Sequence, residues 1–129
     1  MAEVVFDSSA ILALVHRERG AEIVQLHAGS AIVSAVNVGE LGARLVDRGM
    51  SEPQIRTILD SIGVDVVPFD EEQAYMSAAL RSHTRVKGLS LGDRACLALA
   101  KVRGVPALTA DRIWATIDVG VDIRLIRGN

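Results

Sequence analysis

Apolar positions along the chain fall into two alternating patterns. Short, largely apolar runs that are typical of strands lie at residues 3–6, 31–33, 64–69, 107–109 and 122–126. Between them, apolar residues recur every three or four positions, which predicts helices over residues 9–15, 21–28, 36–49, 51–62, 70–82 and 90–102 and a shorter one over 111–117. Short strands that alternate with longer helices predict an α/β fold, in which helices cover both faces of a parallel sheet.

Length and composition limit the chain to one domain without a membrane span. The 129 residues, half of them apolar, suit a single domain over residues 1–129. No apolar run approaches the roughly 18 residues that a span requires. Glu3 and Asp7 stand where a secretory signal would be basic or apolar. A single cysteine, Cys96, allows no internal disulfide, so we expect a cytoplasmic protein.

Charge and aromatic content restrict how the chain could bind nucleic acid. It has 14 basic and 16 acidic residues, and aromatic residues make up only 3%. These numbers argue against a protein that binds single strands through charge and base stacking alone. The mean hydropathy of +0.31 is high for a small domain. It indicates that a partner or a second copy of the chain covers part of the surface.

Four acidic residues are the main candidates for chemistry. Asp7 ends the first predicted strand, and Asp111 closely follows the fourth. Glu40 and Asp93 lie in the first turns of helices that pack on the same sheet. Binding sites of parallel sheets form beyond the carboxyl ends of the strands, so these side chains are expected at one edge. Oxygen ligands in such a group suit a hard divalent cation.

Each of these acids also has a purely structural interpretation. Asp7 and Asp111 could cap the helices that follow them, and Asp93 stands at capping-box distance from Ser90. Glu40 could form an ion pair with Arg44, four residues further along its helix. The scattered histidines and Cys96, which lies in an apolar helix, show no zinc-ligand or nucleophile pattern.

Several segments resemble the PIN-domain ribonucleases, and more narrowly the VapC toxins of bacterial toxin–antitoxin pairs. They are DSSA after the first strand, Glu40-Leu41, LSLGDRACLALA at residues 89–100 and LTADRIW at residues 108–114. The resemblance covers nearly the whole chain. It implies a three-layer α/β/α sandwich around a mainly parallel five-stranded sheet, and a metal-dependent endoribonuclease.

The resemblance also implies roles for individual residues and for partners. Mg²⁺ or Mn²⁺ would be bound by the four acids Asp7, Glu40, Asp93 and Asp111, and Ser9 and Thr109 would support them. The chain would form a homodimer, and the C-terminal segment of an antitoxin would cover the site.

Basic residues near the predicted site are candidates for RNA contacts. Arg85, Lys87, Arg94 and Arg112 could hold phosphates that flank the cleaved bond, although such residues often form only a solvated surface. The bound cation would then offset the negative charge of the carboxylates, so that an acidic site can bind a polyanionic substrate.

Three other functions are compatible with the same pattern. One is a PIN-type nuclease in RNA processing, without an antitoxin. A second is a phosphatase with Asp7 as nucleophile, but Ser9 stands where such enzymes carry a second acid. The third is a non-catalytic α/β domain that binds a metal or a partner through its acidic pocket.

Overall fold

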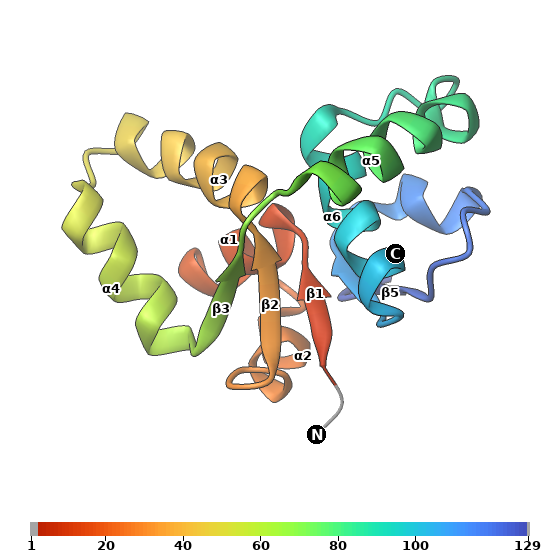
Figure 1. Ribbon diagram of the computed structural model, residues 1–129. Coiled ribbons are helices and arrows are strands. Elements are labelled where there is room, and N and C mark those ends of the chain that lie inside the picture. Colours follow the sequence, from red (N-terminus) through yellow and green to blue (C-terminus); the bar gives the residue numbers. More distant parts are fainter. Residues whose placement is uncertain (1–2, 129) are drawn as a thin grey trace.

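The computed structural model describes residues 3–128 as one five-stranded sheet with helices on both sides (Figure 1). The strands are β1 (Val4–Phe6), β2 (Ala31–Ser34), β3 (Val64–Val67), β4 (Ala107–Thr109) and β5 (Ile123–Leu125). The helices are α1 (Ser8–Val15), α2 (Ala21–Leu26), α3 (Ala35–Asp47), α4 (Glu52–Ile62), α5 (Glu71–Thr84) and α6 (Leu91–Arg103), with a 3₁₀ helix, η1 (Arg112–Thr116). The predicted α/β fold is confirmed.

The sheet has the strand order β3-β2-β1-β4-β5, and every neighbouring pair is parallel. The expectation of a mainly parallel sheet is thus met by a fully parallel one. Strand β3 lies at an edge and ends at Val67, two residues before the predicted end. Pro68 follows it, and a proline lacks the N–H that a strand would donate.

Alternating strand residues separate the interior into two cores. Val4 and Phe6 of β1 pack into the core under α1 to α4, whereas Val5 faces the core under α5, α6 and η1. All three side chains are essentially buried, as expected for a central strand of a parallel sheet. Within residues 3–128, no helix is long and apolar enough to span a bilayer.

Local polar groups define where several helices begin. Ser51 and Gln54 form a capping box at the start of α4, as the sequence Ser-Glu-Pro-Gln indicates. Ser34 caps α3 by accepting a hydrogen bond from the backbone N–H of Val36. Helix α3 therefore begins directly at the end of β2, which places its first turns beside the carboxyl ends of the strands.

The order of the strands creates a switch point beside β1. From β1 the chain proceeds to β2 and β3 on one side, and then returns to β4 on the other. Asp7, just beyond β1, donates its backbone N–H to the carbonyl of Leu108 in β4. The carboxyl ends of β1 and β4 thus flank the crevice where parallel sheets place their ligands, and Asp7 and Asp111 follow these two strands.

Candidate acidic active site

Asp7 lies at the bottom of the candidate site, directly after β1. It occupies the N-cap position of α1, yet its side chain makes no capping hydrogen bond. The residue is only 4% exposed, and its Oδ2 accepts hydrogen bonds from Ser9 Oγ at 2.7 Å and Thr109 Oγ1 at 2.9 Å. Burial raises the pKa of Asp7 to about 6; the two hydroxyl groups oppose this shift, and the charges of Asp93 and Glu40 add to it.

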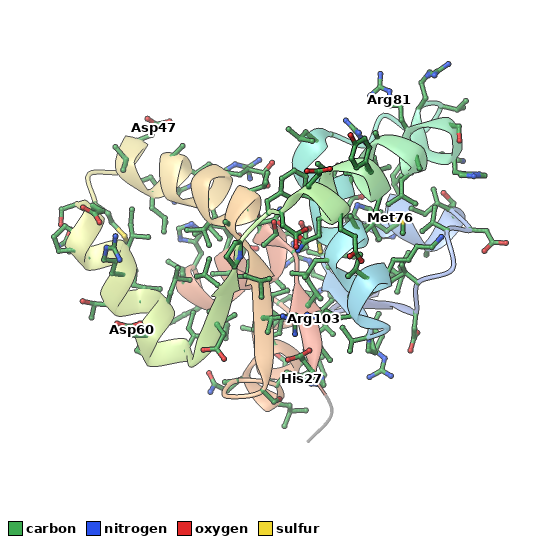
Figure 2. The ribbon with its side chains drawn as sticks, in the orientation of Figure 1. His27, Asp47, Asp60, Met76, Arg81 and Arg103 are labelled. Carbon is green, nitrogen blue, oxygen red and sulfur yellow. The ribbon has the colours of Figure 1, made fainter. Side chains whose placement is uncertain are left out.

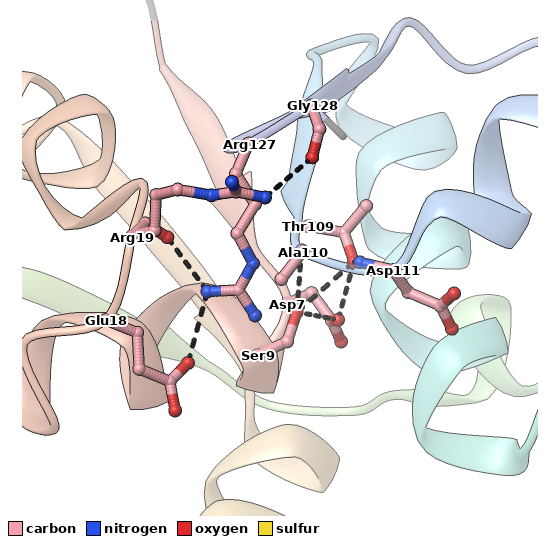
Figure 3. A network of polar contacts seen from close by, with 9 residues as sticks. All are labelled: Asp7, Ser9, Glu18, Arg19, Thr109, Ala110, Asp111, Arg127 and Gly128. Carbon is pink, nitrogen blue, oxygen red and sulfur yellow. Dashed lines mark hydrogen bonds and ion pairs between the residues drawn. The ribbon is translucent and has the colours of Figure 1, made fainter.

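Ser9 and Thr109 connect the two strand ends around Asp7 (Figure 3). Ser9 Oγ accepts a hydrogen bond from the backbone N–H of Ala110 at 2.9 Å, and Thr109 Oγ1 accepts one from the N–H of Asp111 at 3.0 Å. The two hydroxyl oxygens are 3.2 Å apart. The structure therefore places both hydroxyl groups against Asp7, where they fix its carboxylate relative to β4.

Glu40 is held from a different direction, on the first half of α3. Its Oε1 accepts hydrogen bonds from Ser8 Oγ at 2.7 Å and, more weakly, from Asn37 Nδ2 at 3.5 Å. Asn37 is fully buried and also donates to the carbonyl of Gly92 at 3.0 Å. A Cβ at Gly92 would overlap the Glu40 carboxylate. The absence of a side chain at position 92 therefore makes room for this acid.

Ser8 and Asn37 are site residues that sequence analysis did not identify. Ser8 is adjacent to Asp7, and Asn37 lies one turn before Glu40 on an otherwise apolar helix face. A buried asparagine among apolar neighbours is a detectable signal, because burying an amide without partners is costly. The ion pair considered between Glu40 and Arg44 is absent from residues 3–128.

Asp93 forms the capping box considered from sequence. Its Oδ2 accepts the backbone N–H of Ser90 at 2.9 Å, and Ser90 Oγ accepts the N–H of Asp93 at 3.2 Å. Partial burial raises the pKa of Asp93, Ser90 opposes the shift, and the charges of Glu40 and Asp111 add to it.

Asp111 is the most exposed of the four acids and caps η1. Its Oδ1 accepts the backbone N–H of Ile113 at 3.0 Å. The negative charge of Asp111 acts on Asp93, which is also close enough to feel the charge of Glu40. The charges of Asp93 and Glu40 act in turn on Asp7. The structure thus brings all four predicted acids to one edge of the sheet.

The donor chemistry of this edge suits a hard cation, although the side chains do not form a closed ligand group. Across residues 3–128, no three His, Cys, Asp or Glu side chains are grouped so that they could hold a metal ion as they stand. Each of the four carboxylates accepts hydrogen bonds from its own neighbours. Carboxylate oxygens nonetheless match the preference of Mg²⁺ and Mn²⁺, which often bind through few carboxylates and several waters.

The basic residues predicted near the site differ in their availability. Arg85 and Lys87, in the turn after α5, and Arg112, beside Asp111, are exposed. Arg94 is partly buried, and its guanidinium donates to the carbonyl of Ser77 in α5 at 3.1 Å. Arg94 therefore helps to hold α6 against α5 in this structure.

Cys96 is a core residue rather than a nucleophile. It is completely buried beneath the acids, and burial raises the pKa of its thiol well above the ordinary value. A thiol in such surroundings is unreactive.

Comparisons with known proteins place this arrangement in a family. The family model described as the PIN domain matches residues 4–120. Ribonuclease VapC42 of Mycobacterium tuberculosis strain H37Rv is 35% identical over 114 residues, which cover 81% of this chain and 87% of that protein.

Solved structures support the fold. VapBC from Salmonella typhimurium, crystallised with DNA, matches with a TM-score of 0.73 and 17% identity, over 98% of this chain and all of that chain. A toxin–antitoxin complex from Klebsiella pneumoniae matches with a TM-score of 0.70 and 21% identity, over 93% of this chain and 99% of that chain. The chain belongs to the PIN-domain family and, within it, to the VapC ribonucleases.

Proposed function

We propose that this chain is a Mg²⁺- or Mn²⁺-dependent endoribonuclease and acts as the toxin of a toxin–antitoxin pair. The observation that carries the proposal is the environment of Asp7, a buried carboxyl whose pKa is raised to about 6. It caps no helix, and no basic side chain of residues 3–128 pairs with it. A perturbed acid without a structural role is typical of a functional site.

The residues that would hold the cation are Asp7, Glu40, Asp93 and Asp111. When bound, the ion supplies charge neutralisation at the phosphate and lowers the pKa of a water that attacks phosphorus. The chain itself contributes the positions of the carboxylates that would bind this ion. Hydrogen bonds from Ser9 and Thr109 orient Asp7, and those from Ser8 and Asn37 orient Glu40, as the neighbours of metal ligands commonly do.

Exposed basic residues beside the acids would bind the RNA strand. Arg85, Lys87 and Arg112 are free to contact phosphates on the side of α5 and η1. Arg94 could contact a phosphate there only after its guanidinium gave up the hydrogen bond to the carbonyl of Ser77. Such contacts position the substrate without reading its bases.

Apolar side chains around the site support a protein partner. Leu91, two residues before Asp93, is 53% exposed, and Ile113, two residues after Asp111, is 44% exposed. A segment of an antitoxin, such as the partner in the Klebsiella pneumoniae complex, would cover both side chains and the carboxylates between them. Further exposed apolar residues, including Leu26 and Val86, would serve a homodimer, which light scattering of the purified chain would detect.

The decisive experiment uses purified chain, free of antitoxin, with total RNA and Mg²⁺ or Mn²⁺. The informative variant is Asp93→Asn, because an asparagine oxygen can still accept the N–H of Ser90 while the charge is lost. The matched control is Ser90→Ala, which weakens the same helix start and keeps the carboxylate. We expect discrete fragments from the wild type and from Ser90→Ala, but none from Asp93→Asn or in EDTA.

Two results would contradict the proposal. Cleavage that persists in EDTA would exclude the metal site, and metal-dependent cleavage by Asp93→Asn would remove Asp93 from it. A folded chain without cleavage at any metal concentration would instead indicate a domain that only binds a partner. The toxin role is tested by growth: expression should arrest it and the neighbouring gene should restore it, whereas unaffected growth would indicate a nuclease of RNA processing.

A further inference from the structure

A second polar feature, next to the acids, takes no part in the proposed metal chemistry. It is a cleft of about 270 Å³ lined by Ser9 and Leu12 from α1, by His16 and Glu18 just after α1, by Arg44 and Arg48 from the end of α3, and by Arg127 near the C-terminus. We refer to this feature as the basic cleft.

The basic cleft arises because α1 and α3 each turn one stripe of side chains toward the other, a mixed stripe on α1 and a charged one on α3. Ser9, Leu12 and His16 are three and four residues apart, so they share one face of α1 and its C-cap. Glu40, Arg44 and Arg48 follow at intervals of four along α3. Since α1 and α3 pack against one another, the two stripes form opposite walls.

The basic cleft carries an excess of positive charge. Arg127 forms an ion pair with Glu18 at 3.3 Å and donates to the carbonyl of Arg19 at 2.8 Å (Figure 3). Arg44 and Arg48 are exposed, and no carboxylate within residues 3–128 pairs with either. Glu18 therefore offsets one of three guanidinium charges, and two are left for an anion.

The basic cleft is continuous with the acidic site. Ser9 lines the cleft and at the same time donates to Asp7 at 2.7 Å. On α3, the Glu40 carboxylate is turned to Ser8 rather than to Arg44, one helical turn away. The same helix thus presents an acid to the site and, further along, unpaired guanidinium groups to the cleft.

This chemistry fits a phosphate better than a base. A guanidinium group offers a planar fork of donors that matches the oxygens of a phosphate. The residues that line the cleft include no Phe, Tyr or Trp, and His16 offers the single ring against three guanidinium groups. An RNA strand held at the acids extends in two directions, and the exposed Arg85 and Lys87 lie on the α5 side.

We propose that the basic cleft binds a backbone phosphate of the RNA adjacent to the one that is cleaved. The inference rests on the proposed ribonuclease function and adds to it a site that sets the position of the strand. Arg44 and Arg48 are the binding residues, and Arg127 forms the wall that Glu18 holds in place.

The test compares two double variants that remove equal charge. Arg44→Gln/Arg48→Gln empties the cleft of its free guanidinium groups. Arg56→Gln/Arg103→Gln is the control, because these arginines pair with Glu52 and Glu3 on exposed surfaces. Arg103, labelled in Figure 2, pairs with Glu3 directly before β1, so it lies at the amino ends of the strands, opposite to the acids.

The first measurement is binding of a short, fluorescein-labelled single-stranded oligoribonucleotide in EDTA at increasing salt. Each phosphate contact contributes about 0.7 to the slope of log K against log salt concentration. We expect the cleft variant to lose about that amount or more, and the control to keep the wild-type slope. This measurement does not depend on cleavage.

The second measurement is cleavage of an oligoribonucleotide that spans a site mapped in total RNA. We expect KM to rise by about tenfold or more in the cleft variant while kcat changes less, because a charged hydrogen bond is worth about that factor. One methylphosphonate linkage, which removes a phosphate charge, should reproduce the defect in the wild type and add nothing to the cleft variant.

The outcomes separate the two proposals. A wild type that fails to cleave contradicts the proposed function, whatever the salt slope shows. Cleavage with an unchanged slope and KM in the cleft variant overturns the phosphate site and leaves the ribonuclease intact. If the cleft variant loses only its affinity for the antitoxin, the cleft instead binds an acidic peptide.

Discussion

The four acids divide into two pairs that the fold uses differently. Asp7 and Glu40 accept hydrogen bonds from side chains that include distant partners, Thr109 and Ser8. Asp93 and Asp111 accept backbone N–H groups from their own helix starts. The first pair therefore makes no helix-capping hydrogen bond, whereas the second also stabilises helix ends.

This difference indicates which carboxylates are present for stability and which for function. A capping carboxylate lowers the free energy of its helix start by about 1 kcal/mol, so its presence alone says little about chemistry. A buried carboxylate beside other acids raises the free energy of the folded state. Asp7 is consequently the better indicator of function: its neutralisation should stabilise the chain, whereas loss of the Ser90 cap beside Asp93 should destabilise it.

The largest effect is expected on cleavage and should be common to both pairs. Asp7→Asn and Asp93→Asn each remove a charge that would hold the metal. Loss of residues that merely orient metal ligands costs about 10- to 100-fold, so loss of a ligand should exceed about 100-fold in kcat/KM. The measurement is cleavage of the mapped oligoribonucleotide at saturating Mg²⁺. Near-wild-type activity in either variant would remove that acid from the site.

The next largest effect is on stability and should distinguish the pairs. The pKa of Asp7 is about 6 in the folded protein, against an ordinary value of 3.8. The folded state thus binds more protons between these values, and the free energy of unfolding of metal-free protein falls as pH rises through this window. Above about pH 6, ionised Asp7 lowers the free energy of unfolding by its full amount, about 3 kcal/mol.

Asp7→Asn should therefore stabilise the metal-free chain at pH 7.5 by up to about 3 kcal/mol and flatten the pH dependence between pH 4 and 6. Urea denaturation in EDTA measures both. Asp60→Asn is the matched control, because Asp60 is exposed on α4 (Figure 2) and should change little. A destabilised Asp7→Asn chain would show that the Ser9 and Thr109 hydrogen bonds outweigh the burial of the charge.

A smaller effect is expected at the capping pair. Ser90→Ala removes the hydroxyl that accepts the N–H of Asp93 and should cost about 1 kcal/mol. Urea denaturation would measure this loss, and cleavage should remain close to wild type because the Asp93 carboxylate is retained. A large loss of cleavage in this variant would assign Ser90 to the site itself.

The fold could be predicted from the sequence because its signals are local. Apolar spacing, the Ser51 capping box and Pro68 each specify an element through neighbouring residues, and a parallel sheet then follows from their alternation. The positions of Asp7 and Asp111 follow from the same rule, since both come after a strand.

The finer structure of the site depends on contacts between distant segments. Ser8 reaches Glu40 across 32 residues because α1 and α3 pack together. Because of this packing, Glu40 accepts a hydrogen bond from Ser8 and does not pair with Arg44, although the sequence spacing alone favours the ion pair. In sequence, Arg44 and Arg48 resemble ordinary solvated charges, and only the fold shows that they share a cleft with Arg127.

The smallest predicted change in stability concerns Gly92, which lies against Glu40. Gly92→Ala lies in the first turn of α6, where alanine should gain up to about 1 kcal/mol over glycine. The new Cβ would overlap the Glu40 carboxylate, which must then leave Ser8 and Asn37. We therefore expect little net change in stability, together with a fall in kcat of about tenfold through displacement of a metal ligand.

A double-mutant cycle isolates this contact. In a Glu40→Ala chain the overlap is gone, so Gly92→Ala should there show its full stabilisation in urea denaturation, whereas in the wild-type background it should not. Equal effects in both backgrounds would mean that Glu40 is free to move without cost. In that case the Ser8 and Asn37 hydrogen bonds do not hold the acid, and the orientation of Glu40 would have to come from the cation itself.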